Sequence, residues 1–234
     1  MAGSTTDAAE KGEALRRAGA IAGLAAGPFF LISVGLNSWA SIDYLDRLGW
    51  EFVGGEQVPW PSSLARGPYG WAQVATFVVT GLLIVVLAIA VGDQLPRRRA
   101  SSFAVMLLVL LGVALILAAF RVDTPMLRGG NPNTWHGWIH GIAFLLIIAA
   151  GVLAPLTTAL AVRRDPGWRP IAVVSVAASA LFVVFLFLAV GQHHIPAGNR
   201  HTVRLDRIGR RTPDKLPLLT TNVLGWPARW RSPS

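Results

Sequence analysis

Residues 101–120 read SSFAVMLLVLLGVALILAAF, twenty consecutive positions without a single Asp, Glu, Lys or Arg. A segment of about 20 apolar residues is long enough to cross the hydrocarbon core of a bilayer as a helix. Lipid offers no hydrogen-bond partners, so the backbone N–H and C=O groups of such a segment must pair within it. The stretch therefore predicts a transmembrane α-helix.

Four other stretches of the chain share this character, and the five expected spans are 18–40, 71–92, 101–120, 137–162 and 170–190. The first span is longer than the core of a secretory signal peptide and follows acidic residues, which favours a retained helix over a cleaved leader. We therefore expect an all-α, polytopic transmembrane helix bundle over 18–192. A polar N-terminus (1–17) precedes it, and a basic, proline-containing tail (193–234) that we expect to be disordered follows it.

The composition of the chain agrees with a membrane location. Of its 234 residues, 53% are hydrophobic and 14% are charged, whereas soluble domains carry about 25% charged residues. The absence of cysteine excludes disulfides, thiol nucleophiles and zinc–cysteine sites. The net charge of +9 comes from positive residues between the apolar stretches and in the tail. We therefore expect the lipid bilayer as a partner and no nucleic acid.

Positive residues also predict the orientation of the chain. They gather before the first span, at 97–99 and at 163–169, which alternation places on one side of the membrane. The positive-inside rule then puts the N-terminus in the cytoplasm. The basic tail breaks this pattern. Either the number of spans differs by one, or the tail lies outside despite its charge.

The first span carries a repeated small residue. Gly19, Gly23 and Gly27 recur every four positions, which gives one smooth helix face that another helix can approach closely. Packing inside the bundle is the main interpretation of this face. A homo-oligomer that associates through the same face is the alternative.

Ionisable residues gather near the outer ends of three spans. His136 and His140 are four residues apart and so share one helical face at the start of the fourth span. Asp123 follows the third span, and His193 and His194 follow the fifth. Ionisable residues at membrane depth are energetically expensive and often functional. We call Asp123, His136 and His140 the Asp/His cluster.

Three interpretations of the Asp/His cluster remain open from the sequence. As a structural centre, it would hold a loop onto the bundle of a membrane protein of unknown activity. As a metal site, Asp123, His136 and His140, with His193 or His194, would bind a divalent ion such as zinc. The cluster would then be the catalytic centre of a metal-dependent membrane hydrolase acting on a lipid-like substrate. As a polar mouth, it would serve small-molecule transport or ligand binding.

Several motifs resemble one bacterial membrane family, the domain of unknown function 998. They are GPFF (27–30), GPYGW (67–71), FRVDTP (120–125) and HGWIH (136–140). The resemblance covers about residues 18–192. It implies a protein of a bacterial plasma (inner) membrane with six transmembrane helices, no established activity and an important Asp/His cluster. In this chain a polar tail stands where the resemblance implies a sixth helix.

Overall fold

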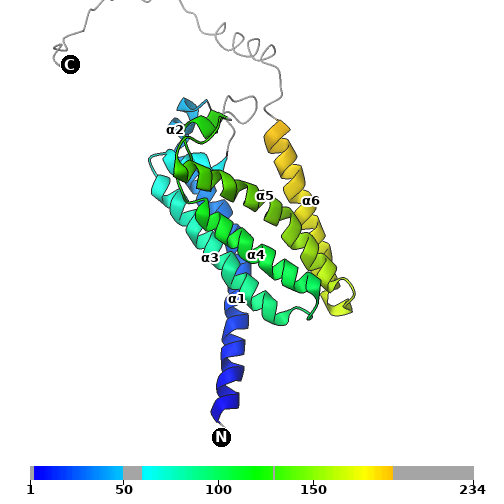
Figure 1. Ribbon diagram of the computed structural model, residues 1–234. Coiled ribbons are helices and arrows are strands. Elements are labelled where there is room, and N and C mark those ends of the chain that lie inside the picture. Colours follow the sequence, from blue (N-terminus) through cyan, green and yellow to red (C-terminus); the bar gives the residue numbers. More distant parts are fainter. Residues whose placement is uncertain (1–2, 50–59, 129, 192–234) are drawn as a thin grey trace, which may run out of the picture. The chain divides into compact units, whose positions relative to one another are not determined.

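A computed structural model describes residues 3–49, 60–128 and 130–191 of the chain, and all regular secondary structure in these residues is helical (Figure 1). The long helices are α1 (Gly3–Ala40), α3 (Gly70–Gln94), α4 (Arg99–Leu117), α5 (Trp135–Val162) and α6 (Arg169–Gly191). Shorter elements connect them: α2 (Ile42–Arg47) and the 3-10 turns η1 (Pro61–Arg66), η2 (Pro125–Arg128) and η3 (Pro166–Trp168).

Five helices in the described part of the chain are long and apolar enough to cross a membrane, and they confirm the predicted all-α bundle. The helix α1 begins at Gly3 and so includes the described part of the polar N-terminal segment 1–17. Within this polar part, Arg17 pairs with Glu13 one turn earlier at 2.8 Å, a spacing that supports an exposed helix. The basic tail lies outside the described residues.

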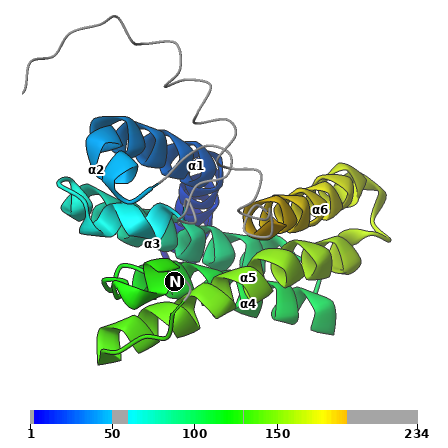
Figure 2. The ribbon, with the colours of Figure 1, turned by 90° about the horizontal axis from the view of Figure 1, so that it is seen from above.

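The long helices pack as a series in chain order, with contacts between α1 and α3, α3 and α4, α4 and α5, and α5 and α6. Seen from above, α1 and α6 stand apart at the two ends of this series (Figure 2). The connections alternate between the two ends of the bundle. We call the end where α1 stops and where α3 and α5 begin the loop end.

A close helix contact joins α3 and α4 at two glycines. A Cβ atom on Gly81 would lie 2.5 Å from the carbonyl oxygen of Gly112, and one on Gly112 would lie 2.7 Å from that of Gly81. The two backbones therefore touch directly, which only small residues permit. Without a hydrophobic driving force inside lipid, such close packing is a main source of helix association.

Two of the three glycines that recur in α1 face α3. Gly19 lies against Ala90, and a Cβ on Gly23 would lie 3.0 Å from the Leu87 side chain. A Cβ on Gly27 would meet nothing within 4 Å. The first two glycines thus contribute to packing within this chain. The homo-oligomer through the same face stays a prediction.

A small polar network joins α1 to α3 at the loop end. Ser41 donates a hydrogen bond of 3.2 Å to the Asn37 side-chain oxygen, and the Asn37 amide donates one of 3.4 Å to Gln73. All three residues are buried. Because polar groups in a bilayer need internal partners, this network fixes the end of α1 beside the start of α3.

The glycine contact yields the first testable prediction. We expect Gly112→Ala to destabilise the protein by roughly 1–3 kcal/mol, because the new methyl group would push α4 away from the Gly81 carbonyl. Gly35→Ala is the matched control, since a Cβ at Gly35 meets nothing within 4 Å. Thermal unfolding of both variants in detergent measures the difference. Equal unfolding temperatures would contradict the backbone contact.

Candidate functional site

The start of α5 is fixed by a threonine cap. Thr134 has an extended backbone, and its hydroxyl oxygen accepts a hydrogen bond of 3.1 Å from the Gly137 N–H. This side chain satisfies one of the N–H groups that a helix start leaves without a partner. The cap explains why α5 begins at Trp135, two positions before the expected start at 137.

Asp123 holds this cap in place from the other side of the loop. One carboxylate oxygen accepts hydrogen bonds from the backbone N–H groups of Asn133 at 2.8 Å and Thr134 at 2.9 Å. The other oxygen accepts one from the Thr134 hydroxyl at 2.7 Å. Asp123 is only 5% exposed. Its carboxylate therefore clamps the start of α5 to the segment that follows α4.

The hydrogen bonds also set the charge of this carboxylate. Burial by itself would raise the pKa of Asp123. The bonds from the Thr134 hydroxyl and from the N–H groups of Asn133 and Thr134, together with nearby His136, outweigh burial and hold the pKa below its ordinary value. Donors that point at a carboxylate favour its ionised form. Asp123 is therefore an anion at neutral pH.

The same threonine determines the tautomer of His136. The single hydroxyl proton of Thr134 goes to Asp123, so its oxygen acts as acceptor toward the other neighbours. His136 Nδ1 lies 2.6 Å from this oxygen and must therefore carry a proton. It lies 3.9 Å from the nearer Asp123 oxygen. Asp123, Thr134 and His136 thus form one connected group, which we call the α5 clasp.

His140 lies one turn deeper and takes part in a different interaction. It is 4% exposed, and its Nδ1 donates a hydrogen bond of 2.8 Å to the backbone carbonyl of Phe120. This bond ties α5 to the chain just after α4. The Asp/His cluster therefore divides into two parts, with Asp123 and His136 in the α5 clasp and His140 outside it.

The metal hypothesis gains no support from the described residues. Among them, no three His, Asp or Glu side chains are placed to hold one metal ion. His193 and His194, the other expected ligands, lie outside the residues that the structure describes. The metal site stays a prediction that metal analysis of the purified protein would test.

Two residues of the site escaped the sequence analysis. Thr134 connects Asp123 to His136, and its position directly before an apolar helix is a recognisable cap signal. Arg66, at the end of η1, donates a hydrogen bond of 2.9 Å to the carbonyl of Val122. That bond fastens η1 beside the α5 clasp. No local sequence pattern indicates a contact between residues so far apart in the chain.

A second contact holds η1 against the end of α1. Tyr44 of α2 donates a hydrogen bond of 3.3 Å from its hydroxyl to the carbonyl of Ser63. Burial raises the pKa of Tyr44, an effect that nearby Arg66 partly offsets. Tyr44 is therefore protonated at neutral pH and available as the donor. η1 is thus held from both sides across the loop end.

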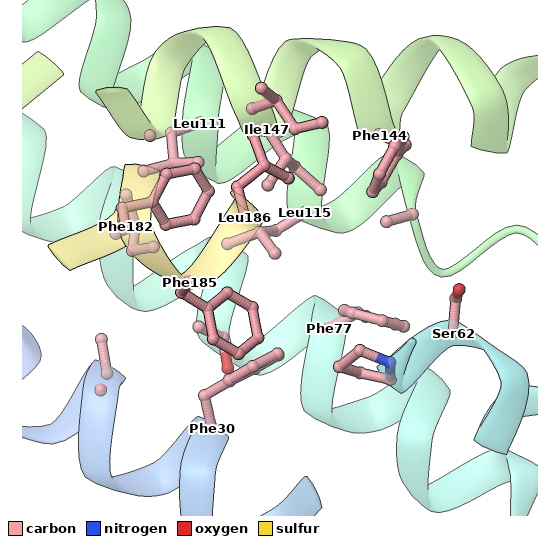
Figure 3. Close-up of a pocket in the computed structure, with 18 of the residues that line it drawn as sticks. Phe30, Ser62, Phe77, Leu111, Leu115, Phe144, Ile147, Phe182, Phe185 and Leu186 are labelled. Atoms are coloured by element: carbon pink, nitrogen blue, oxygen red, sulfur yellow. The ribbon is translucent and has the colours of Figure 1, made fainter. Parts of the chain in front are cut away.

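A cavity of about 440 Å³ lies beneath η1, between α1, α3, α4, α5 and α6 (Figure 3). Its walls are mainly aromatic and aliphatic, and they include Phe30, Phe77, Leu115, Phe144, Ile147 and Phe182. The polar side chains among its described lining are Ser62, Thr80 and His140, with the Trp60 indole. Trp60 packs edge-on against Phe144 at 5.1 Å between ring centres. His140 is therefore the one member of the Asp/His cluster that lines the cavity.

The α5 clasp predicts a position that tolerates no side chain. A methyl group on Gly137 would collide with the Asp123 carboxylate, whereas one on Gly141, a turn later, would lie 3.5 Å from Met126 in ordinary contact. We expect Gly137→Ala to lower the unfolding temperature and Gly141→Ala to leave it nearly unchanged. Thermal unfolding in detergent compares the two. A Gly137→Ala protein as stable as the Gly141→Ala protein would refute the clasp.

The pKa of Asp123 predicts how stability depends on pH. Because this pKa is lower in the folded protein than its ordinary value of 3.8, ionised Asp123 stabilises the fold. The contribution is fully present well above pH 3.8 and is lost as the pH falls through the folded pKa. We expect the wild type to unfold at a higher temperature than Asp123→Asn at neutral pH, with the gap shrinking below pH 3.8. A gap that widens on acidification would have the wrong sign.

Comparison with known proteins gives one match. The family described as "Protein of unknown function (DUF998)" matches residues 61–203. The match takes in α3 to α6, the α5 clasp and His140, and α1 lies before it. No curated protein and no solved structure matches the chain. Because the matched residues make up more than half of the sequence, this multi-pass membrane protein belongs to the DUF998 family of proteins of unknown function.

Proposed function

We propose that this protein binds a lipid-like amphipathic molecule in the cavity between its helices. The observation that carries the proposal is an apolar cavity of about 440 Å³ inside a bundle of transmembrane helices, with polar side chains in its lining. Sites for small molecules commonly measure about 300–1,000 Å³ and combine apolar walls with a few polar groups. This is the ligand-binding alternative among the three interpretations of the sequence.

Polar groups of the cavity lie toward one end of it, as an amphipathic ligand would need. Ser62 of η1 and His140 of α5 contribute polar groups near the loop end. Pro155, which also lines the cavity, lies fifteen positions further along α5, about 22 Å at 1.5 Å per residue. A polar head near His140 would therefore place an apolar chain toward the middle of the bundle.

The bilayer itself supplies a route for such a ligand. The lining comes from α1 and α6 as well as from the three helices between them. α1 and α6 stand at opposite ends of the helix series (Figure 2). A molecule already dissolved in the membrane would approach between them without crossing water. The α5 clasp and Arg66 would then hold the loop end in the shape that keeps His140 against the cavity.

We further propose that the protein lies in a bacterial plasma membrane with its N-terminus in the cytoplasm. The basic connections 97–99 and 163–169 support this orientation, because they meet at one end of the bundle. Arg98 donates a hydrogen bond of 2.9 Å to the Ala161 carbonyl and pairs with Asp165 at 3.3 Å. The cavity would then open near the outer half of the membrane.

Filling the cavity tests the proposed function. Ala178 of α6 lines the cavity, whereas Ala180 is also exposed on α6 but does not line it. We expect Ala178→Phe to reduce labelling by a photoreactive palmitoyl glycerol probe at least about tenfold, and Ala180→Phe to leave labelling unchanged. The full chain in phosphatidylcholine nanodiscs is the sample, and mass spectrometry locates the labelled peptides. Equal labelling of both variants, or labels confined to lipid-facing positions, would refute the proposal.

A further inference from the structure

We infer that the ligand is an uncharged single-chain lipid with a hydroxyl head and a carbonyl at the start of its chain, as in a monoacylglycerol. This inference rests on the ligand-binding function proposed above and names its chemical class. Two side chains carry it. They are Thr80 of α3 and His140 of α5, which both line the cavity.

Thr80 is unlike the other threonines of α3 and α5. Thr76, Thr157 and Thr158 each donate a hydrogen bond of 2.8 Å to the carbonyl four residues earlier. Thr80 is only 4% exposed, yet its hydroxyl has no hydrogen-bond partner in the described part of the chain. A buried hydroxyl without a partner is costly. The oxygen itself is covered, although other atoms of Thr80 line the cavity. A ligand that offers an acceptor to this hydroxyl, once the side chain rotates toward the cavity, would remove this cost.

A carbonyl oxygen is the acceptor that best suits this position. The Thr80 hydroxyl can donate one hydrogen bond. An ester or amide carbonyl of the ligand can accept it without adding a charge to the ligand. An ionised group so deep in an apolar cavity would need an opposite charge. The described lining contains no Asp, Glu, Lys or Arg to supply one.

The free ring nitrogen of His140 favours a ligand group that donates a hydrogen bond. Its Nδ1 is engaged with the carbonyl of Phe120, and a carbonyl only accepts, so this nitrogen carries a proton. In the neutral ring the remaining nitrogen, Nε2, is an acceptor. A hydroxyl head can donate to Nε2, whereas an ionised carboxylate has no proton to give. A ligand with both a hydroxyl and a carbonyl therefore satisfies the two side chains.

The depths of the two residues give the order of these groups. α3 and α5 both begin at the loop end (Figure 1). His140 lies five positions after the first residue of α5, and Thr80 lies ten after the first residue of α3. At 1.5 Å per residue these are about 7.5 Å and 15 Å along their helices. The hydroxyl head would thus lie near the loop end and the carbonyl deeper, where the acyl chain begins.

The test compares sixteen-carbon ligands that differ only in the head. Monopalmitoylglycerol, methyl palmitate, hexadecylglycerol ether and palmitoyl lysophosphatidate compete with the photoreactive probe on the full chain in nanodiscs. We expect monopalmitoylglycerol to compete most strongly. Methyl palmitate lacks the hydroxyl and the ether lacks the carbonyl, so each should bind about three- to tenfold more weakly, the range for one neutral hydrogen bond.

The variant Thr80→Val separates binding from folding. It keeps the shape of the side chain, and its hydroxyl has no partner in the described residues, so the unfolding temperature should not fall. We expect it to weaken monopalmitoylglycerol binding about three- to tenfold and to leave the ether unaffected. Thr157→Val is the control, because Thr157 bonds to its own helix and does not line the cavity.

The outcomes distinguish the two proposals. Absence of competition by every ligand would overturn the proposed function itself. Strongest competition by the anionic lysophosphatidate would overturn the uncharged class while leaving ligand binding intact. That result would point to a His140 imidazolium, in which both ring nitrogens donate. Unchanged monopalmitoylglycerol affinity in Thr80→Val would overturn the role of Thr80.

Discussion

The Asp123 carboxylate accepts three hydrogen bonds, and the geometry of the loop end follows from them. They fix Thr134 as the cap of α5, and the cap sets both the first residue of the helix and the tautomer of His136. Starting α5 at this point places His140 one turn deeper, against Phe120 and beside the cavity. A buried carboxylate near a membrane needs hydrogen-bond donors from the protein, and Asn133 and Thr134 supply them to both oxygens of Asp123.

The rest of the bundle depends on a second constraint, the close approach of helices inside lipid. Gly81 and Gly112 let α3 and α4 touch, and Gly19 lets α1 reach Ala90. Between these contacts the interior is filled largely by alanine, with Ala104, Ala114 and Ala143 fully buried. Small residues such as these let helix backbones approach closely. Larger aromatic residues, among them Phe30, Phe77, Phe144 and Phe182, line the cavity.

The number and type of the helices could be predicted from the sequence because each span is an uninterrupted apolar run, a local property. The sequence also predicted that Asp123 and His136 lie at the same end of the bundle, because the topology of the spans brings them there. It could not predict three contacts: the link between them through Thr134, the hydrogen bond of His140 to Phe120, and that of Arg66 to Val122. These depend on helix rotation and on loop geometry, which no local pattern specifies. The sequence also could not show that the Thr80 hydroxyl lacks a hydrogen-bond partner. A threonine inside an apolar helix normally forms a hydrogen bond with the backbone of its own helix.

The helix series also has a mechanical consequence. α6 is held mainly by α5, and its far face is exposed along residues such as Val173, Leu181 and Phe187. The wall of the cavity that α6 forms is therefore held mainly by one neighbouring helix, α5. A small change in the tilt of α6 would alter the width of the cavity without disturbing the tightly joined pair α3 and α4. A ligand bound in the cavity as proposed would therefore meet one cavity wall, α6, that is held mainly by a single neighbouring helix.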